Sequence, residues 1–208
     1  MPFNGREKRI MMTKKEKAVL AVEALKKDYP EAICSLSAET DFELLIATRL
    51  SAQCTDARVN LVTPALFAKY RTLEDYANAE VEDVEELIRS CGFYHTKARD
   101  IIGMAQEIIS RFDGKVPGTM EELLTLPGVG RKTANLLLGD VFKVPGSTVV
   151  DTHCIRLTNR MGIIDNIKDP VKIEPVLRQL LPPEESNDFC HRLVLHGRAV
   201  CDARKPLC

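Results

Sequence analysis

Apolar residues recur every three or four positions through most of this chain, and strict alternation of apolar and polar residues is hard to find. The pattern is clearest in residues 18–29, 81–87, 98–112 and 176–181. Such spacing places apolar side chains on one face of a helix, where they pack against a core. The pattern therefore predicts an all-α protein, and roughly ten helices joined by short loops account for its length.

Glycine and proline mark the connections between the predicted helices, as at Asp113-Gly114. Pro64 lies inside the apolar pattern of residues 59–70. Because proline in a helix interior removes a backbone hydrogen bond, we expect this helix to be kinked or divided at Pro64.

The N-terminal stretch, residues 1–17, is polar and basic and lacks the apolar core of a secretory signal. We expect it to be a frayed approach to the first helix, with translation beginning at Met1, Met11 or Met12. No apolar stretch reaches the length that spans a bilayer, so we expect no membrane association.

The composition bounds the function without identifying it. With 208 residues, 45% of them hydrophobic, the chain can bury one large core or two smaller ones. Seven cysteines without an export signal indicate a reducing cytosol. Five of them lack metal-ligand spacing and are expected to be small buried residues: Cys34, Cys54, Cys91, Cys154 and Cys190. A formal net charge of −1 means that any contact with nucleic acid must depend on a local site.

A glycine hairpin that opens a helix is the first candidate site, in the stretch LPGVGRKTA of residues 126–134. Gly128 and Gly130 allow positive φ and close approach of a ligand, and the amides there lie at the positive end of the following helix. Such a turn can hold a phosphate group without net positive charge. The alternative is a tight connection between two helices with no ligand.

Lys132 falls in the first turn of that helix, next to Arg131. The helix N-terminus and the neighbouring cation both disfavour a charged ammonium group. A neutral amine at this position can attack an electrophilic carbon and form a Schiff base. The alternative for Lys132 is a solvated surface side chain.

Asp151 precedes a predicted helix that runs to Gly162. Aspartate is among the preferred N-cap residues, so a structural role is sufficient to explain it. A capping carboxylate at the edge of a cleft can also stabilise positive charge that develops on a sugar, or move the proton of an attacking amine. The two roles are compatible.

Six motifs in order resemble the endonuclease III family of the helix-hairpin-helix DNA glycosylase superfamily. They are FELLIA (42–47), LSAQ (50–53), TD (55–56), the hairpin with its helix (126–135), VDTH (150–153) and HGR (196–198). The similarity extends from about Lys14 to the end of the chain. It implies a monomeric, bacterial, nucleoid-associated enzyme that flips damaged bases or abasic sites out of double-stranded DNA.

The resemblance also implies a reaction. The enzyme would be a bifunctional DNA glycosylase and abasic-site lyase for oxidised or ring-saturated pyrimidines. Lys132 would be the nucleophile that attacks C1′, expels the base and leaves a Schiff base, from which β-elimination cuts the strand; Asp151 would be the catalytic aspartate. No metal activates this chemistry. Adenine-mismatch glycosylases of the same fold carry a non-nucleophilic residue here, so Lys132 argues against that subfamily.

Two loops would enter the DNA. Gln53 matches the family residue that fills the gap left by the flipped nucleotide. Phe93 stands where the best-known relatives carry leucine, and its aromatic ring would act as a wedge that parts a base step. Without the resemblance, Gln53 is an ordinary loop residue and Phe93 a core residue. The remaining DNA contacts implied for the hairpin are Leu126, Gly128, Val129, Gly130, Arg131 and Thr133.

The family holds a 4Fe–4S cluster with four cysteines spaced C-x6-C-x2-C-x5-C. Cys201 and Cys208 match the first interval, so the resemblance implies two of the four ligands and a sequence truncated at its C-terminus. Taken alone, the pair is a weak metal signal and can be two free thiols. Nearby Arg198, Arg204 and Lys205 fit a phosphate-contacting surface or a solvated tail.

The family fold divides the chain into two helical lobes. Residues 34–144 would form a six-helix barrel with the helix-hairpin-helix at about 120–139, and residues 1–33 with 145–208 would form the terminal, iron-sulfur type lobe. The cleft between them would hold DNA, with Lys132 and Asp151 opening onto one groove. Two other functions stay open: a glycosylase for mismatched thymine or uracil, and a non-catalytic DNA-binding module.

Overall fold

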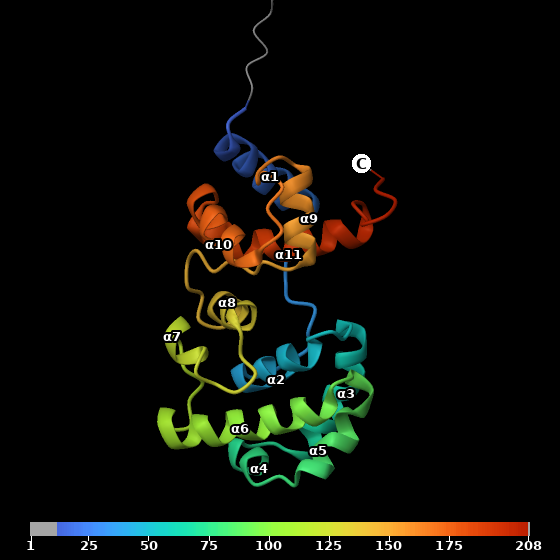
Figure 1. Cartoon of the computed structure of the whole chain (residues 1–208), viewed down its shortest axis with the longest axis vertical. Coiled ribbons are helices and arrows are strands. Elements are labelled where there is room, and N and C mark those ends of the chain that lie inside the picture. The colour runs from blue at the N-terminus through green and yellow to red at the C-terminus, as the bar shows by residue number, and fades with distance from the viewer. Residues whose placement is uncertain (1–11, 208) are drawn as a thin grey trace, which may run out of the picture.

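The computed structural model describes residues 12–207, which are helical with no strand among them, so the all-α prediction is confirmed (Figure 1). The helices are α1 (Lys14–Asp28), α2 (Asp41–Ser51), α3 (Asp56–Lys69), α4 (Leu73–Ala77), α5 (Val81–Ile88), α6 (Tyr94–Phe112), α7 (Met120–Leu123), α8 (Arg131–Asp140), α9 (Thr152–Arg160), α10 (Pro170–Leu180) and α11 (Ser186–Ala199). Two short 3₁₀ helices, η1 (Arg89–Cys91) and η2 (Pro183–Glu185), complete them. None of the helices within residues 12–207 is long and apolar enough to cross a membrane.

Helix starts carry side-chain caps that the sequence supplies locally. The Thr13 hydroxyl caps α1 by accepting a hydrogen bond from the Glu16 amide, and the Glu16 carboxylate accepts one from the Thr13 amide. Because this capping box satisfies amides that the helix leaves unpaired, α1 begins at Lys14. The expectation of a frayed segment up to residue 17 is therefore wrong for its last four residues, while Met1 and Met11 lie outside the described residues.

Of the two outcomes expected at Pro64, a kinked or a divided helix, the division does not occur, because α3 runs from Asp56 to Lys69 with Pro64 inside it. The proline is exposed, whereas Val59, Val62 and Leu66 are buried in the core before and after it. Packing on both sides of the proline keeps the helix continuous despite the missing N–H group.

The buried residues form two separate hydrophobic cores, one for each lobe in Figure 1. One core lies among α2–α8 and the other among α1, α9, α10 and α11. Within the first lobe, α7 is a single turn of four residues. Val149 belongs to the first core and Val150 to the second, so the cores change over a few residues beyond position 144. The domain limits themselves stay a prediction.

Polar pairs join the two lobes. Arg131 of α8 donates to both carboxylate oxygens of Glu174 on α10, at 2.6 and 3.1 Å, and Arg178 lies 3.2 Å from the same carboxylate. His191 of α11 contacts Asp140 at the end of α8, with 2.8 Å between Nε2 and Oδ1. These contacts fix both ends of α8 against the second lobe.

Glu174 is only 4% exposed and serves two arginines, so it is expected to contribute to this interface. Glu174→Gln should lower the free energy of unfolding by about 1 to 3 kcal/mol, because a buried carboxylate with charged donors is replaced by a neutral amide. Glu107→Gln removes an exposed pair with Arg111 and should cost less than about 0.5 kcal/mol. Urea denaturation of the two variants checks this, and equal losses would contradict it.

Candidate active site between the lobes

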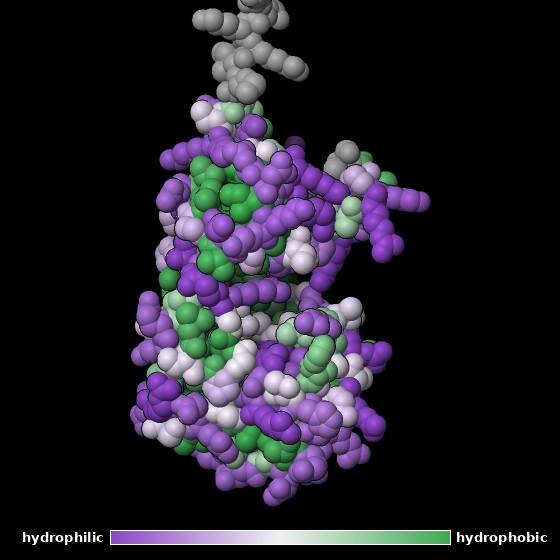
Figure 2. Space-filling view, viewed as in Figure 1, coloured by the Kyte–Doolittle hydropathy of each residue, from purple (hydrophilic) through white to green (hydrophobic). Residues whose placement is uncertain are grey.

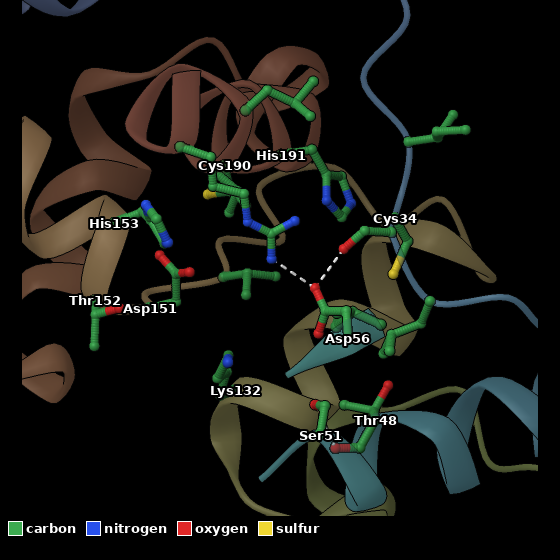
Figure 3. Close-up of a pocket in the computed structure, with 18 of the residues that line it drawn as sticks. Cys34, Thr48, Ser51, Asp56, Lys132, Asp151, Thr152, His153, Cys190 and His191 are labelled. Carbon is green, nitrogen blue, oxygen red and sulfur yellow. Dashed lines mark hydrogen bonds and ion pairs between the residues drawn. The ribbon is translucent and has the colours of Figure 1, made fainter. Parts of the chain in front are cut away.

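A cavity of about 200 Å³ lies between the lobes. Its walls come from residues 33–36, α2, the start of α3, α8, the start of α9, and α11. Figure 2 shows a mostly hydrophilic face whose outline is indented between the two lobes. Lys132 and Asp151 both line this cavity, one from each side of the lobe junction (Figure 3). The predicted geometry, in which both side chains open onto one groove, is confirmed.

Lys132 is placed by the first turn of α8, and its side chain is exposed to solvent. Gly130 is the N-cap residue of α8, and no side chain caps the helix, so its first amides remain available to a ligand. Arg131 turns away toward Glu174 in the other lobe. Lys132 is thus the basic residue of this turn that faces the cavity.

Asp151 is the N-cap of α9, as the sequence predicted, and its Oδ1 accepts from the Cys154 amide at 2.7 Å. The cap holds the carboxylate at the cavity edge, where Figure 3 places it between His153 and Lys132. Structural and chemical roles are therefore compatible at this residue.

His153 lines the cavity beside Asp151, and no role of its own is expected for it from the sequence. Burial lowers its pKa, and the cations of Arg156, Arg198 and Lys132 add to that effect against the opposing influence of Asp151. Arg156 lies 3.1 Å from Nδ1, and a guanidinium can only donate. We infer a neutral imidazole with its proton on Nε2.

Asp56 lies across the cavity from His153 and was also given no role of its own. Burial would raise its pKa, but hydrogen bonds from Ser35 and Arg198 outweigh that effect, so the net shift of the pKa is downward. Arg198, which fits a phosphate-contacting surface or a solvated tail by sequence, donates to Asp56 at 2.7 Å and joins α11 to α3. The cavity thus holds a fixed carboxylate on its far wall.

The hairpin conforms to the sequence prediction at one glycine and departs from it at the other. Gly128 has φ +70°, as expected, whereas Gly130 has φ −105°, so the prediction of positive φ at Gly130 is wrong. Gly130 takes extended backbone because it is an N-cap. Leu126 and Val129 are buried in the first core, which leaves only their backbone groups for a DNA contact.

Gly128 is expected to be intolerant of a side chain. An added Cβ would lie 2.5 Å from both Arg49 Nε and Asp100 Oδ2, which form an ion pair beneath the hairpin. Gly128→Ala should lower the free energy of unfolding by at least about 2 kcal/mol, because it combines this clash with positive φ.

Gly130 provides the matched control, because no atom lies within 4 Å of its added Cβ. Gly130→Ala should change the free energy of unfolding by less than about 1 kcal/mol. Thermal or urea unfolding of the two variants distinguishes them, and a stable Gly128→Ala protein would contradict the packing described here.

Gln53 and Phe93 lie on two loops that line a second hollow. Both residues have positive φ, 55° and 48°, which is uncommon for residues other than glycine. Phe93 is 67% exposed, so its interpretation as a core residue is wrong. Strained backbone and an exposed aromatic side chain are features of a binding surface.

The cysteines differ in part from expectation. Cys91, Cys154 and Cys190 are buried, but Cys34 and Cys54 are only half-buried because they line the cavity. Burial raises the pKa of the Cys34 thiol to about 11, so it is a poor nucleophile at neutral pH.

The proposed cluster ligands are described only in part, since Cys208 lies outside residues 12–207. Cys201 is buried, with Arg160 Nη1 3.1 Å from its Sγ. No group of three or more His, Cys, Asp or Glu residues is arranged to hold a metal within the described chain. These residues do not by themselves fit a 4Fe–4S cluster, which needs four ligands.

The chain is similar to several proteins of known function. A family model described as HhH-GPD superfamily base excision DNA repair protein matches residues 46–183. Proteins named endonuclease III from Synechocystis sp. and Bacillus subtilis are 50% and 42% identical to it over 200 and 180 residues. These matches cover 96% and 86% of this chain and 91% and 82% of those proteins. A solved structure described as a trapped endonuclease III–DNA covalent intermediate matches with a TM-score of 0.88 and 42% identity, over 94% of this chain and 91% of that one.

Proposed function

Because the chain belongs to the HhH-GPD superfamily of base excision DNA repair proteins, we propose that its interlobe cavity is the active site, with Lys132 as nucleophile and Asp151 as the catalytic carboxylate. The chain is a DNA glycosylase and abasic-site lyase that binds DNA. The observation that carries the proposal is the placement of an exposed lysine and an N-cap aspartate, from opposite sides of the lobe junction, in one cavity.

The substrate reaches this cavity as a flipped nucleotide. A base stacked in duplex DNA cannot present C1′ to Lys132, so the damaged nucleotide must rotate out, at a cost of a few kcal/mol. Oxidised or ring-saturated pyrimidines stack and pair poorly, which lowers that cost. The cavity of about 200 Å³ would hold the base between residues of both lobes.

The reaction then proceeds in two stages. The Lys132 amine attacks C1′, the glycosidic bond breaks, and the base leaves with a proton. Opening of the sugar ring gives a Schiff base between C1′ and Nζ. Loss of a proton from C2′ expels the 3′ phosphate and cuts the strand. Asp151 stabilises the positive charge that develops on the sugar and accepts the proton of the attacking amine.

The surrounding groups would hold the DNA. The uncapped amides at the start of α8 face solvent next to Lys132, where they can bind a phosphate of the lesion strand. Gln53 would occupy the gap opposite the orphaned base and Phe93 would part the neighbouring base step. Arg131 and Thr133 complete the proposed hairpin contacts, although Arg131 also holds Glu174.

The oligomeric state, location and cofactor proposed for the enzyme are those of the endonuclease III family. The enzyme would act as a monomer on chromosomal DNA in the bacterial cytoplasm. Cys201, next to Arg160, and Cys208 would be two of the four thiolate ligands of the family's 4Fe–4S cluster, which would take no part in base removal. Iron and acid-labile sulfide in the purified protein test this, and a stably folded, active protein without either would contradict it.

Substrate choice tests the proposed function most simply. Duplex oligonucleotides of one sequence carry thymine glycol, a G·T mismatch, a G·U mismatch or a normal pair at the same position. We expect base release and strand cleavage with thymine glycol, and at least about tenfold lower rates with the mismatches. Faster base release from the mismatches would show that mismatched thymine or uracil, and not an oxidised pyrimidine, is the preferred substrate. DNA binding without base release from any substrate would indicate a non-catalytic module.

A further inference from the structure

Lys97 on α6 is completely buried, with 0% of its surface exposed. Its ammonium donates to two backbone carbonyls, Leu50 O and Cys91 O, each at 2.8 Å. No carboxylate within the described residues forms an ion pair with it. Burial lowers the pKa of Lys97, which reflects the cost of a charge in this position. The hydrogen bonds to Leu50 O and Cys91 O offset part of that cost. Leu50 and Cys91 belong to segments that are distant from each other in sequence.

The two carbonyls belong to the two loops proposed to enter DNA. Leu50 lies in the last turn of α2, just before the Gln53 loop, and Cys91 ends η1, two residues before Phe93. The buried Lys97 ammonium therefore bridges the Gln53 loop and the Phe93 loop from the protein interior. Both loops hold a residue with positive φ, a conformation that persists only where the surroundings over-determine it.

The same helix face also supports the hairpin. One turn after Lys97, Asp100 accepts from Arg49 at 2.7 Å between Oδ2 and Nε, and Gly128 packs directly against this pair. α6 thus connects both loops to the hairpin that leads to Lys132. A change at Lys97 can therefore alter DNA insertion without any contact with the flipped base.

We propose that Lys97 is a positioning residue that fixes the Gln53 and Phe93 loops relative to each other, so that both side chains enter the duplex together. This inference rests on the proposed function, in which the two loops separate the lesion from its neighbours. Lys97 does not line the interlobe cavity, so its effect on the reaction runs through the loops. A methionine would match its length but leave both carbonyls without donors.

The test compares two substrates with the Lys97→Met protein. Single-turnover removal of thymine glycol from a duplex requires both loops, and we expect it to slow by about 10- to 100-fold through misplacement of the loops. Borohydride trapping on an abasic site in a single strand requires no displacement of a paired nucleotide. We expect this rate to change by less than about threefold. Lys69→Met, which removes an exposed lysine, is the matched control and should leave both rates unchanged.

The outcomes separate this inference from the proposed function. Absence of trapping with the unaltered protein refutes the proposed function. Normal trapping and normal duplex excision by a folded Lys97→Met protein refute only the role of Lys97. Equal losses on both substrates also refute it, because they indicate general damage to the active site.

A double-mutant cycle tests whether Lys97 acts through the loops. In a protein that already carries Gln53→Ala and Phe93→Ala, adding Lys97→Met should slow duplex excision by less than about threefold. A full additional loss would overturn the proposal. If Lys97→Met lacks the helical content of the unaltered protein, the cycle is run with Lys97→Arg, which keeps the charge in a larger, planar group. Lys97→Arg should likewise slow duplex excision by less than about threefold when it is added to Gln53→Ala and Phe93→Ala.

Discussion

Replacement of Lys132 by alanine is expected to abolish cleavage of DNA at abasic sites, with a loss of at least about a thousandfold in the single-turnover rate. Without the amine no Schiff base can form, and no other lysine in the described chain lines the cavity to take its place. The side chain is exposed and makes no buried contact, so the variant should fold with unchanged stability.

Binding and chemistry can be separated in this variant. Affinity for duplex DNA with a stable abasic analogue should fall by less than about tenfold, because removal of one phosphate or sugar contact weakens binding only modestly. Lys172→Ala, an exposed substitution on α10, provides the control for loss of a positive charge and should retain full activity. Persistent lyase activity in Lys132→Ala would exclude Lys132 as the nucleophile.

Asp151→Asn is expected to slow base removal by about 100- to 1,000-fold while leaving the fold intact. Asparagine caps helices as well as aspartate does, so its side-chain oxygen can still accept from the Cys154 amide. The substitution therefore removes the negative charge and the proton acceptor but keeps the cap.

Asp151→Ala separates the contribution of the N-cap to stability from the contribution of the carboxylate to the reaction. It removes the cap as well and should lower the free energy of unfolding by about 1 kcal/mol relative to Asp151→Asn. Thermal unfolding and single-turnover excision are measured for both variants. Full activity of the asparagine variant would show that the cap alone explains this residue.

Local chemistry made much of this architecture predictable. Apolar spacing of three and four residues identifies helices because each has one buried face, and the cap at Asp151 can be recognised from residue type and position. The errors arise where tertiary packing overrides a local rule. Pro64 does not divide α3 because its ring faces solvent while the buried residues on both sides pack against one core.

The candidate site was predictable only as far as its motifs extend. Lys132 and Asp151 lie in local patterns that the sequence displays. Asp56 and His153 lie in two of the matched motifs, TD (55–56) and VDTH (150–153), but only the packing of the lobes shows that both line the cavity. Lys97 is an extreme case, since a lysine in an amphipathic pattern is normally exposed, whereas here it is buried and donates to the carbonyls of Leu50 and Cys91.

In the proposed mechanism, Lys132 forms a covalent bond with the sugar of the damaged nucleotide. The most direct test is reaction of the full chain with a duplex that contains thymine glycol, in the presence of borohydride, followed by proteolysis and mass spectrometry of the DNA-linked peptide. We expect one adduct per protein molecule, located at Lys132, and none with Lys132→Ala. An adduct at another residue, or base release without any trapped adduct, would contradict it.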